Sequence, residues 1–85
     1  MDEINGYEAY LRTEKKASEN TLSSYLRDVR QFAEYCTREG LTLTKVNQPD
    51  VEGYVRYLTS RGKSVSTVTR AAASLKSFYG YLIRT

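Results

Sequence analysis

The residues best suited to chemistry are hydroxylic and basic, and they gather at two matching places. Ser18-x-x-Thr21 recurs 46 positions later as Ser64-x-x-Thr67. A serine in such a place caps the first turn of a helix, where hydroxyls and free N–H groups bind phosphate well. The repeat therefore predicts two equivalent helix starts, and both N-termini are expected to face one side of the domain as a single anion-binding surface.

Charge is sorted along the chain. Residues 1–42 hold six Lys/Arg against eight Asp/Glu (−2), residues 43–85 hold seven against two (+5), and together they give the formal net charge of +3. From Gly53 to the C-terminus there are six basic residues and no acid. Such an imbalance attracts phosphate polymers, although a basic face on a small protein is often only a solvated surface.

Catalytic and metal chemistry find little support in this composition. The chain has no histidine, and its carboxylates and glycines follow neither metal-ligand nor phosphate-loop spacing. None of the eight tyrosines has a partner set to activate it as a nucleophile. We therefore expect no catalytic residue, no metal and no cofactor.

The cellular setting follows from cysteine usage and hydropathy. Cys36 is the single cysteine, so no internal disulfide is possible, and a reducing cytoplasm fits best. No apolar run is long enough to span a membrane, so we expect no membrane partner.

Hydrophobic spacing predicts an all-α fold in one domain that covers residues 1–85. Gly40 suits the end of the second helix, Pro49-Asp50 the start of the third, and Arg61-Gly62-Lys63 a tight turn before the fourth. The predicted helices run over roughly 2–15, from Ser18 to near Gly40, over about 50–61, and from Ser64 to about Ile83.

The repeat extends to the first and third helices at an offset of 47 residues. The matching positions are Ile4, Tyr7, Tyr10 and Leu11 against Val51, Tyr54, Tyr57 and Leu58. Chance similarity between amphipathic helices is the alternative. Because caps, aromatic residues and turn lengths all agree, we predict two helical hairpins that pack into a compact four-helix bundle.

The fourth helix has two contrasting arcs. The expected core arc holds Val65, Val68, Ala71, Ala72, Leu75, Phe78, Tyr79, Leu82 and Ile83. The opposite arc holds Ser66, Thr67, Thr69, Arg70, Ala73, Ser74, Ser77, Gly80 and Arg84, with Lys76 at its border. Small side chains there would let the backbone approach a DNA groove closely, and the alternative is a second helix-packing face.

The second helix presents a similar stripe, made of Asn20, Ser24, Arg27, Gln31 and Arg38. Asp28 and Glu34 flank it and would repel phosphate unless they pair with Arg27, Arg30 or Arg38.

Among the tyrosines, the pattern places Tyr7, Tyr25, Tyr54 and Tyr79 in the core, and Tyr10, Tyr35, Tyr57 and Tyr81 at more exposed positions open to domain contacts.

Several ordered segments resemble one family. They are Ala17–Phe32, Gln48–Val51, Arg61–Thr67 and Ser74–Leu82. Together they are similar to the N-terminal core-binding, SAM-like domain of tyrosine recombinases, which include phage integrases and Xer-like enzymes. The resemblance implies half of a C-shaped clamp around duplex DNA. A C-terminal catalytic domain would form the other half and carry the tyrosine nucleophile, and the full-length parent would act as a tetramer on DNA.

The resemblance also implies which residues meet DNA. They are Asn20, Ser24 and Arg27 on the second helix, and Lys63, Ser66, Thr67, Arg70 and Lys76 around the fourth. Ala71 and Ala72 stand where relatives often carry a basic residue and a leucine, so Arg70 is expected to carry more of the contact. Glu19 lies beside the proposed surface and makes Asn20 a weaker candidate.

We therefore interpret the chain as the DNA-binding domain of a site-specific tyrosine recombinase or integrase, cut from a longer polypeptide. The domain itself would not be an enzyme. The alternative is a helical protein–protein interaction module.

Overall fold

The computed structural model describes the backbone of residues 2–84 and the side chains of residues 3–83. Within that range the chain has no strand, which confirms the all-α prediction. No helix among these described residues is long and apolar enough to cross a membrane. The side chain of Arg84, predicted on the polar arc, lies outside the described residues. The elements are α1 (Asp2–Thr13), α2 (Glu19–Glu39), the 3-10 helix η1 (Leu43–Lys45), α3 (Gln48–Ser60) and α4 (Val65–Arg84).

The starts of α2 and α4 have the same geometry, as the repeat predicts. At α2, Ser18 Oγ accepts from the N–H of Thr21 at 3.2 Å and donates to its hydroxyl at 3.0 Å. At α4, Ser64 makes the same two bonds with Thr67 at the same distances. Each serine satisfies an N–H that has no partner within its own helix. The duplicated helix start is confirmed.

The other helix boundaries follow local backbone chemistry. Gly40 ends α2 in the left-handed conformation (φ 72°), and the next N–H, that of Leu41, donates to Cys36 at 2.8 Å. The predicted start of the third helix is wrong by two residues, because Asn47 caps α3. Asp50 completes a reciprocal capping box with Asn47 and does not act as the cap itself.

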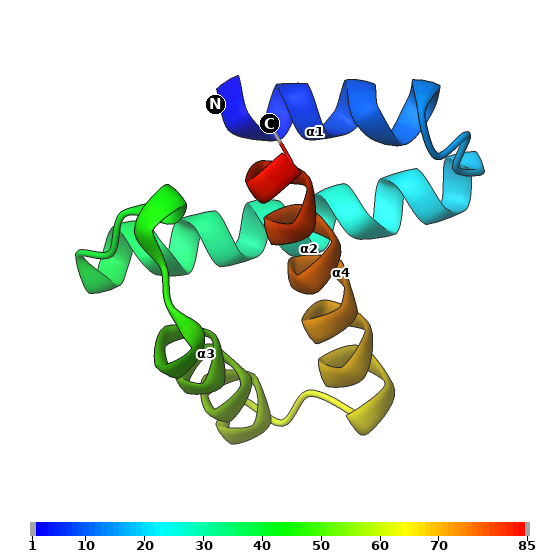
Figure 1. The fold of residues 1–85 in the computed structure, drawn as a ribbon. Coiled ribbons are helices and arrows are strands. Elements are labelled where there is room, and N and C mark those ends of the chain that lie inside the picture. The colour runs from blue at the N-terminus through cyan, green and yellow to red at the C-terminus, as the bar shows by residue number, and fades with distance from the viewer. Residues whose placement is uncertain (1, 85) are drawn as a thin grey trace.

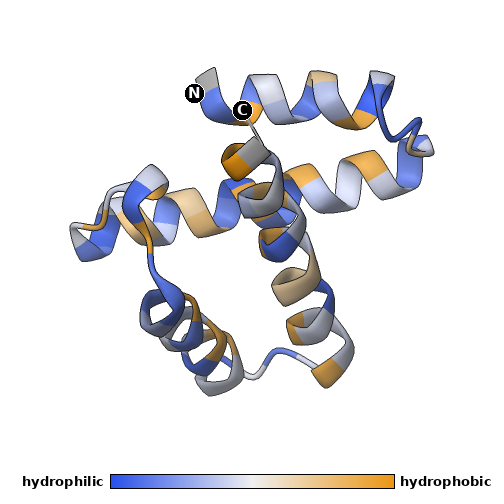
Figure 2. Cartoon of the chain, viewed as in Figure 1, coloured by the Kyte–Doolittle hydropathy of each residue, from blue (hydrophilic) through white to orange (hydrophobic). Residues whose placement is uncertain are grey.

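The four long helices form two hairpins that cross. In Figure 1, α1 and α2 lie side by side and run in opposite directions, while α4 crosses α2 at a steep angle and its C-terminal end reaches α1. The turn at 61–64 joins α3 to α4. Hydrophobic and hydrophilic residues interleave along each helix, as amphipathic helices require (Figure 2). The predicted packing of two hairpins into a bundle is confirmed.

Two aromatic clusters join the hairpins, and each draws rings from both. Tyr7 of α1 meets Phe78 of α4 edge-on, with ring centroids 5.2 Å apart. Tyr54 of α3 meets Phe32 of α2 in the same manner at 4.9 Å. These pairs are equivalent under the repeat, and all four rings are buried. The first helix of each hairpin therefore packs on the second helix of the other, which fixes the angle at which α2 and α4 cross.

The tyrosines expected to be more exposed also contribute to this packing. Tyr10 lies 5.0 Å from Tyr81, and Tyr35 lies 5.1 Å from Tyr57, between ring centroids. All four are half-buried against the core. These contacts within the domain occupy part of the ring surface that a domain contact would need.

Three predictions for α4 are wrong. Val65 and Ile83, assigned to the core arc, are 82% and 85% exposed, whereas Ser74, assigned to the polar arc, is fully buried. The position of a residue on a helical arc gives only the direction of its side chain. The side chain is buried only if another helix covers that part of the arc. Val65 and Ile83 lie in the end turns of α4, whereas Ser74 lies where α4 crosses α2.

Candidate nucleic-acid interface

The site is built on the first halves of α2 and α4, which diverge from their crossing point. Both helix starts lie on the right-hand side of Figure 1, that of α2 above that of α4. Asn20 precedes Asp28 by eight residues, about 12 Å along the helix, and Asp28 contacts Arg70. Asn20 therefore lies about 12 Å along α2 from the residue that Arg70 contacts, and not at the opposite end of the domain.

An ion pair occupies the angle between the two helices. Asp28 of α2 is 2% exposed. Its carboxylate accepts from Arg70 Nε at 3.0 Å and from Arg70 Nη2 at 3.1 Å, so the pair is bidentate. Ser74 Oγ donates to the same carboxylate at 2.9 Å. The hydrogen bonding of Arg70 to Asp28 and the charge of that carboxylate raise the pKa of Arg70 above its already high ordinary value, so Arg70 stays cationic.

This pairing corrects the expectation for Asp28. The predicted partners were arginines near it in sequence, but Asp28 points to α4 and is neutralised there. Arg30 instead turns toward α1, where it lies 3.9 Å from Glu8. One signal in the sequence was available: Asp28 and Ser74 are separated by the repeat distance of 46, so they occupy equivalent positions where two equivalent helices cross.

The α2 candidates form an outward stripe. Asn20 and Arg27 are exposed, and Ser24 is half-buried. Arg27 lines a shallow hollow of about 450 Å³, whose wall includes the carboxylate residue Glu34. Glu19, beside Asn20, lies 3.4 Å from Arg12, which offsets part of its repulsion of phosphate.

The α4 candidates separate into two groups. Lys63 and Ser66 are exposed at the helix start, and the half-buried Thr67 belongs to the cap. Lys76 faces the other way, because it lines a groove between α4 and the start of α3. Arg70 therefore lies on the side of α4 that faces α2, with Lys63, Ser66 and Thr67 at the start of the same helix, whereas Lys76 lies on the side that faces α3.

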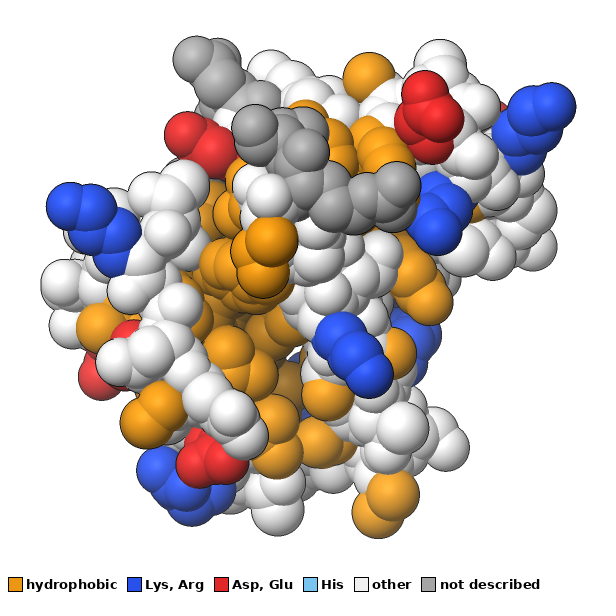
Figure 3. All heavy atoms as spheres, in the orientation of Figure 1, with side chains coloured by type: hydrophobic (Ala, Val, Ile, Leu, Met, Phe, Trp, Pro, Cys, Tyr) orange, Lys and Arg blue, Asp and Glu red, His pale blue; other side chains and the backbone are white. Residues whose placement is uncertain are grey.

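That groove is largely apolar and measures about 960 Å³. Figure 3 shows it as an orange hollow between α3 and α4. Val46, Val51, Leu82 and the exposed Ile83 are among its lining. Lys76 is the one charged residue among the described residues that line it.

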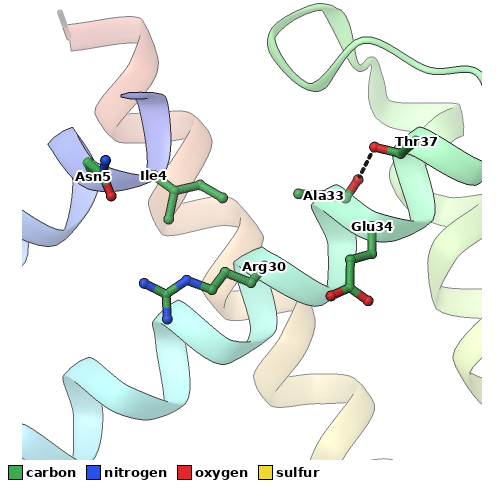
Figure 4. A pocket seen from close by; sticks show the side chains of 6 residues that line it. All are labelled: Ile4, Asn5, Arg30, Ala33, Glu34 and Thr37. Carbon is green, nitrogen blue, oxygen red and sulfur yellow. Dashed lines mark hydrogen bonds between the residues drawn. The ribbon is translucent and has the colours of Figure 1, made fainter. Parts of the chain in front are cut away.

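A second groove, between α1 and α2, is the repeat equivalent of the first. It is lined by Ile4, Asn5, Arg30, Ala33, Glu34 and Thr37 (Figure 4). Arg30 corresponds to Lys76, and Thr37, whose hydroxyl donates to the carbonyl of Ala33 at 3.1 Å, corresponds to Ile83. The equivalent grooves therefore differ in lining: the groove between α1 and α2 is lined mostly by polar residues, and the groove between α3 and α4 is largely apolar.

Comparison with known proteins places the chain in a family. Residues 4–85 match the model of the phage integrase N-terminal, SAM-like domain. A protein of Caldanaerobacter subterraneus named as a tyrosine recombinase is 40% identical over 73 residues, which are 86% of this chain and 25% of that protein. The tyrosine recombinase XerD of Oceanobacillus iheyensis is 37% identical over 83 residues, which are 95% of this chain and 28% of that protein.

A third relative, the tyrosine recombinase XerC of Pediococcus pentosaceus, is 33% identical over 86 residues, which are 99% of this chain and 29% of that protein. No solved structure was found to match. The chain therefore spans roughly a quarter of the length of these curated relatives. By the match of the family model over nearly its whole length, the chain belongs to the phage integrase N-terminal, SAM-like domain family.

Proposed function

We propose that this domain binds duplex DNA as the core-binding part of a site-specific tyrosine recombinase. One observation carries the proposal: α2 and α4 begin with identical serine caps and diverge from a crossing that holds Arg70, so both helix starts face one side. Helix starts favour phosphate through their free N–H groups and dipoles. The contact residues would be Asn20, Ser24, Arg27, Lys63, Ser66, Thr67 and Arg70, whereas Lys76, which lines the groove toward α3, lies outside this set.

Phosphate contacts would supply most of the affinity. Short side chains such as Ser66 would let the helix backbone come close to DNA, and the exposed cations Arg27 and Lys63 lie in the first half of α2 and just before α4. Each phosphate neutralised by such a cation makes binding more sensitive to salt: it adds about −0.9 to the slope of the logarithm of the binding constant against the logarithm of the salt concentration. We therefore expect weak binding that falls steeply as salt is added.

Within a recombinase the domain would grip and orient the DNA. The chain contains no histidine, and no candidate nucleophile emerges from its tyrosines, which pack in the core or in the ring clusters. Strand cleavage would therefore belong to a C-terminal catalytic domain of the same polypeptide. We further propose that the parent acts as a tetramer on paired sites in the cytoplasm.

The test is a titration of the 85-residue chain with a duplex of about two helical turns at several salt concentrations. Fluorescence anisotropy measures the duplex affinity at each concentration. Arg27→Gln with Lys63→Gln should weaken binding and reduce the salt slope by about two. The matched control is Arg38→Gln with Arg56→Gln. Arg38 lies 18 residues beyond Asn20 on α2, about 27 Å away, and Arg56 lies on α3. Equal losses from both pairs would mean non-specific attraction and would refute the proposed surface.

The apolar groove favours a second candidate function, a helical protein–protein interaction module. Val51, Leu82 and the exposed Ile83 offer apolar surface to an amphipathic helix. This face is not the hydroxylic arc of α4 that the sequence suggested for helix packing. Docking there would tolerate added salt, whereas duplex binding would not. A domain with only this function would show no duplex binding that depends on Arg27 and Lys63 in the same titration.

A further inference from the structure

Asp28 is a buried charged residue, and within the described part of the chain all its hydrogen-bond donors come from α4. Arg70 donates from Nε and Nη2, and Ser74 donates from Oγ. A buried carboxylate is costly unless it is paired in this way. The three bonds fix not only the carboxylate but also the plane of the Arg70 guanidinium.

One edge of that guanidinium remains open. Of its five N–H groups, one on Nε and one on Nη2 point to Asp28, which leaves three. No hydrogen-bond acceptor for Nη1 lies among the described residues, and the Arg70 side chain is 41% exposed. The fork formed by Nη1 and Nη2 therefore keeps free donors on a partly exposed side chain, in the angle between α2 and α4.

A fork of this kind fits two neighbouring acceptors, such as two phosphate oxygens or the O6 and N7 atoms of a guanine. We propose that Asp28 is a positioning residue, which holds Arg70 so that its open fork meets one such pair of acceptors on duplex DNA. This inference rests on the proposed function. Arg70 would then bind without first losing the rotamer freedom of a free arginine.

Positioning and simple electrostatics make opposite predictions. Replacing Asp28 by Asn removes one negative charge and raises the formal net charge of +3 by one. Electrostatics alone would then strengthen the attraction to DNA. Positioning predicts weaker binding, because the guanidinium loses the carboxylate that aligns it.

The experiment is a double-mutant cycle on duplex affinity with Asp28→Asn and Arg70→Lys. Circular dichroism confirms that each variant is folded at the temperature of the titration. Each single change should weaken binding about tenfold, within the range of one bidentate contact. The double variant should be no weaker than either single one, since both changes remove the same contact. A duplex of A·T pairs alone distinguishes the acceptors: a guanine contact makes the loss depend on sequence, and a phosphate contact does not.

Unchanged or tighter binding by folded Asp28→Asn would overturn the inference, as would losses that simply add in the double variant. If Asp28→Asn does not fold, Arg70→Lys decides alone, because it keeps the charge and removes the fork. If Arg70→Lys binds the duplex with unchanged affinity, the inference is overturned. In each of these cases, a normal response to Arg27→Gln with Lys63→Gln would leave the proposed function standing.

Discussion

Stability offers the sharpest test of the ion pair at the crossing of α2 and α4, because its two halves are buried to different degrees. The Asp28 side chain is 3% exposed and that of Arg70 is 41% exposed. Arg70→Met leaves a buried carboxylate with Ser74 as its remaining donor. Asp28→Leu leaves an arginine that can turn into water. The first change should therefore cost more than the second.

The size of the loss follows from this difference. Breaking a fully buried pair by removing one partner costs about 3–5 kcal/mol. Because Arg70 is partly solvated, we expect about 2–3 kcal/mol for Arg70→Met. For a domain of this size, that loss lowers the unfolding temperature by roughly 10–20 °C. The double variant, with Leu and Met in place of the pair, should recover most of the loss, since apolar replacements of such pairs are often neutral.

Thermal and denaturant unfolding followed by circular dichroism measure these changes. Arg12→Met is the matched control, because it removes exposed ion pairs with Glu8 and Glu19 and should cost less than about 1 kcal/mol. A loss from Arg70→Met no larger than that of the control would refute the reasoning. So would a double variant whose loss equals the sum of the two single losses.

Three further predictions concern pH, caps and glycine. Burial raises the pKa of Tyr54 to about 12, from 10.0 for a free tyrosine. A folded-state pKa raised in this way contributes stability that is complete below pH 10 and is lost as the pH rises toward 12. The unfolding temperature should therefore fall between these two pH values. An unfolding temperature that stays constant over this range would contradict the prediction. Ser18→Ala and Ser64→Ala should each lower the unfolding free energy by about 1 kcal/mol, and unequal losses would show that the matching caps are not energetically equivalent. Gly80→Ala should stabilise α4 by about 0.5–1 kcal/mol, because a Cβ there meets nothing within 4 Å. Gly6→Ala should not stabilise α1, because the new Cβ would collide with the hydroxyl of Tyr81. Denaturant unfolding compares the stabilities of the two glycine variants.

Features governed by neighbouring residues were predictable from the sequence. A serine cap, a left-handed glycine and an apolar stripe act within one or two turns, so the helix starts at Ser18 and Ser64 and the end at Gly40 follow from local chemistry. The boundary of α3 was missed by two residues. Asn47 and Asp50 are both good capping residues, and only the backbone decides which one lies outside the helix.

Features that depend on a second element were not predictable in the same way. Asp28 looked like a flanking surface charge, but α4 covers it and supplies its partner. Ile83 has the spacing of a core residue, yet no described element covers it. The separation of Lys76 from Arg70 likewise depends on which neighbour each side of α4 faces.

The internal repeat distinguishes what the fold requires from what it merely permits. Both hairpins share the serine caps and the buried aromatic pairs, so those features are needed to build the bundle. The hairpins differ where Arg70 replaces its equivalent Ser24, and where Ile83 replaces its equivalent Thr37. The helix itself does not require either residue, since Ser24 and Thr37 stand at the equivalent places; Arg70 is explained by the buried Asp28 that it neutralises, whereas Ile83 is exposed. One difference adds a cation at the crossing of α2 and α4, and the other makes the groove between α3 and α4 apolar, so these are the two positions at which the second hairpin offers contacts beyond this domain that the first hairpin does not.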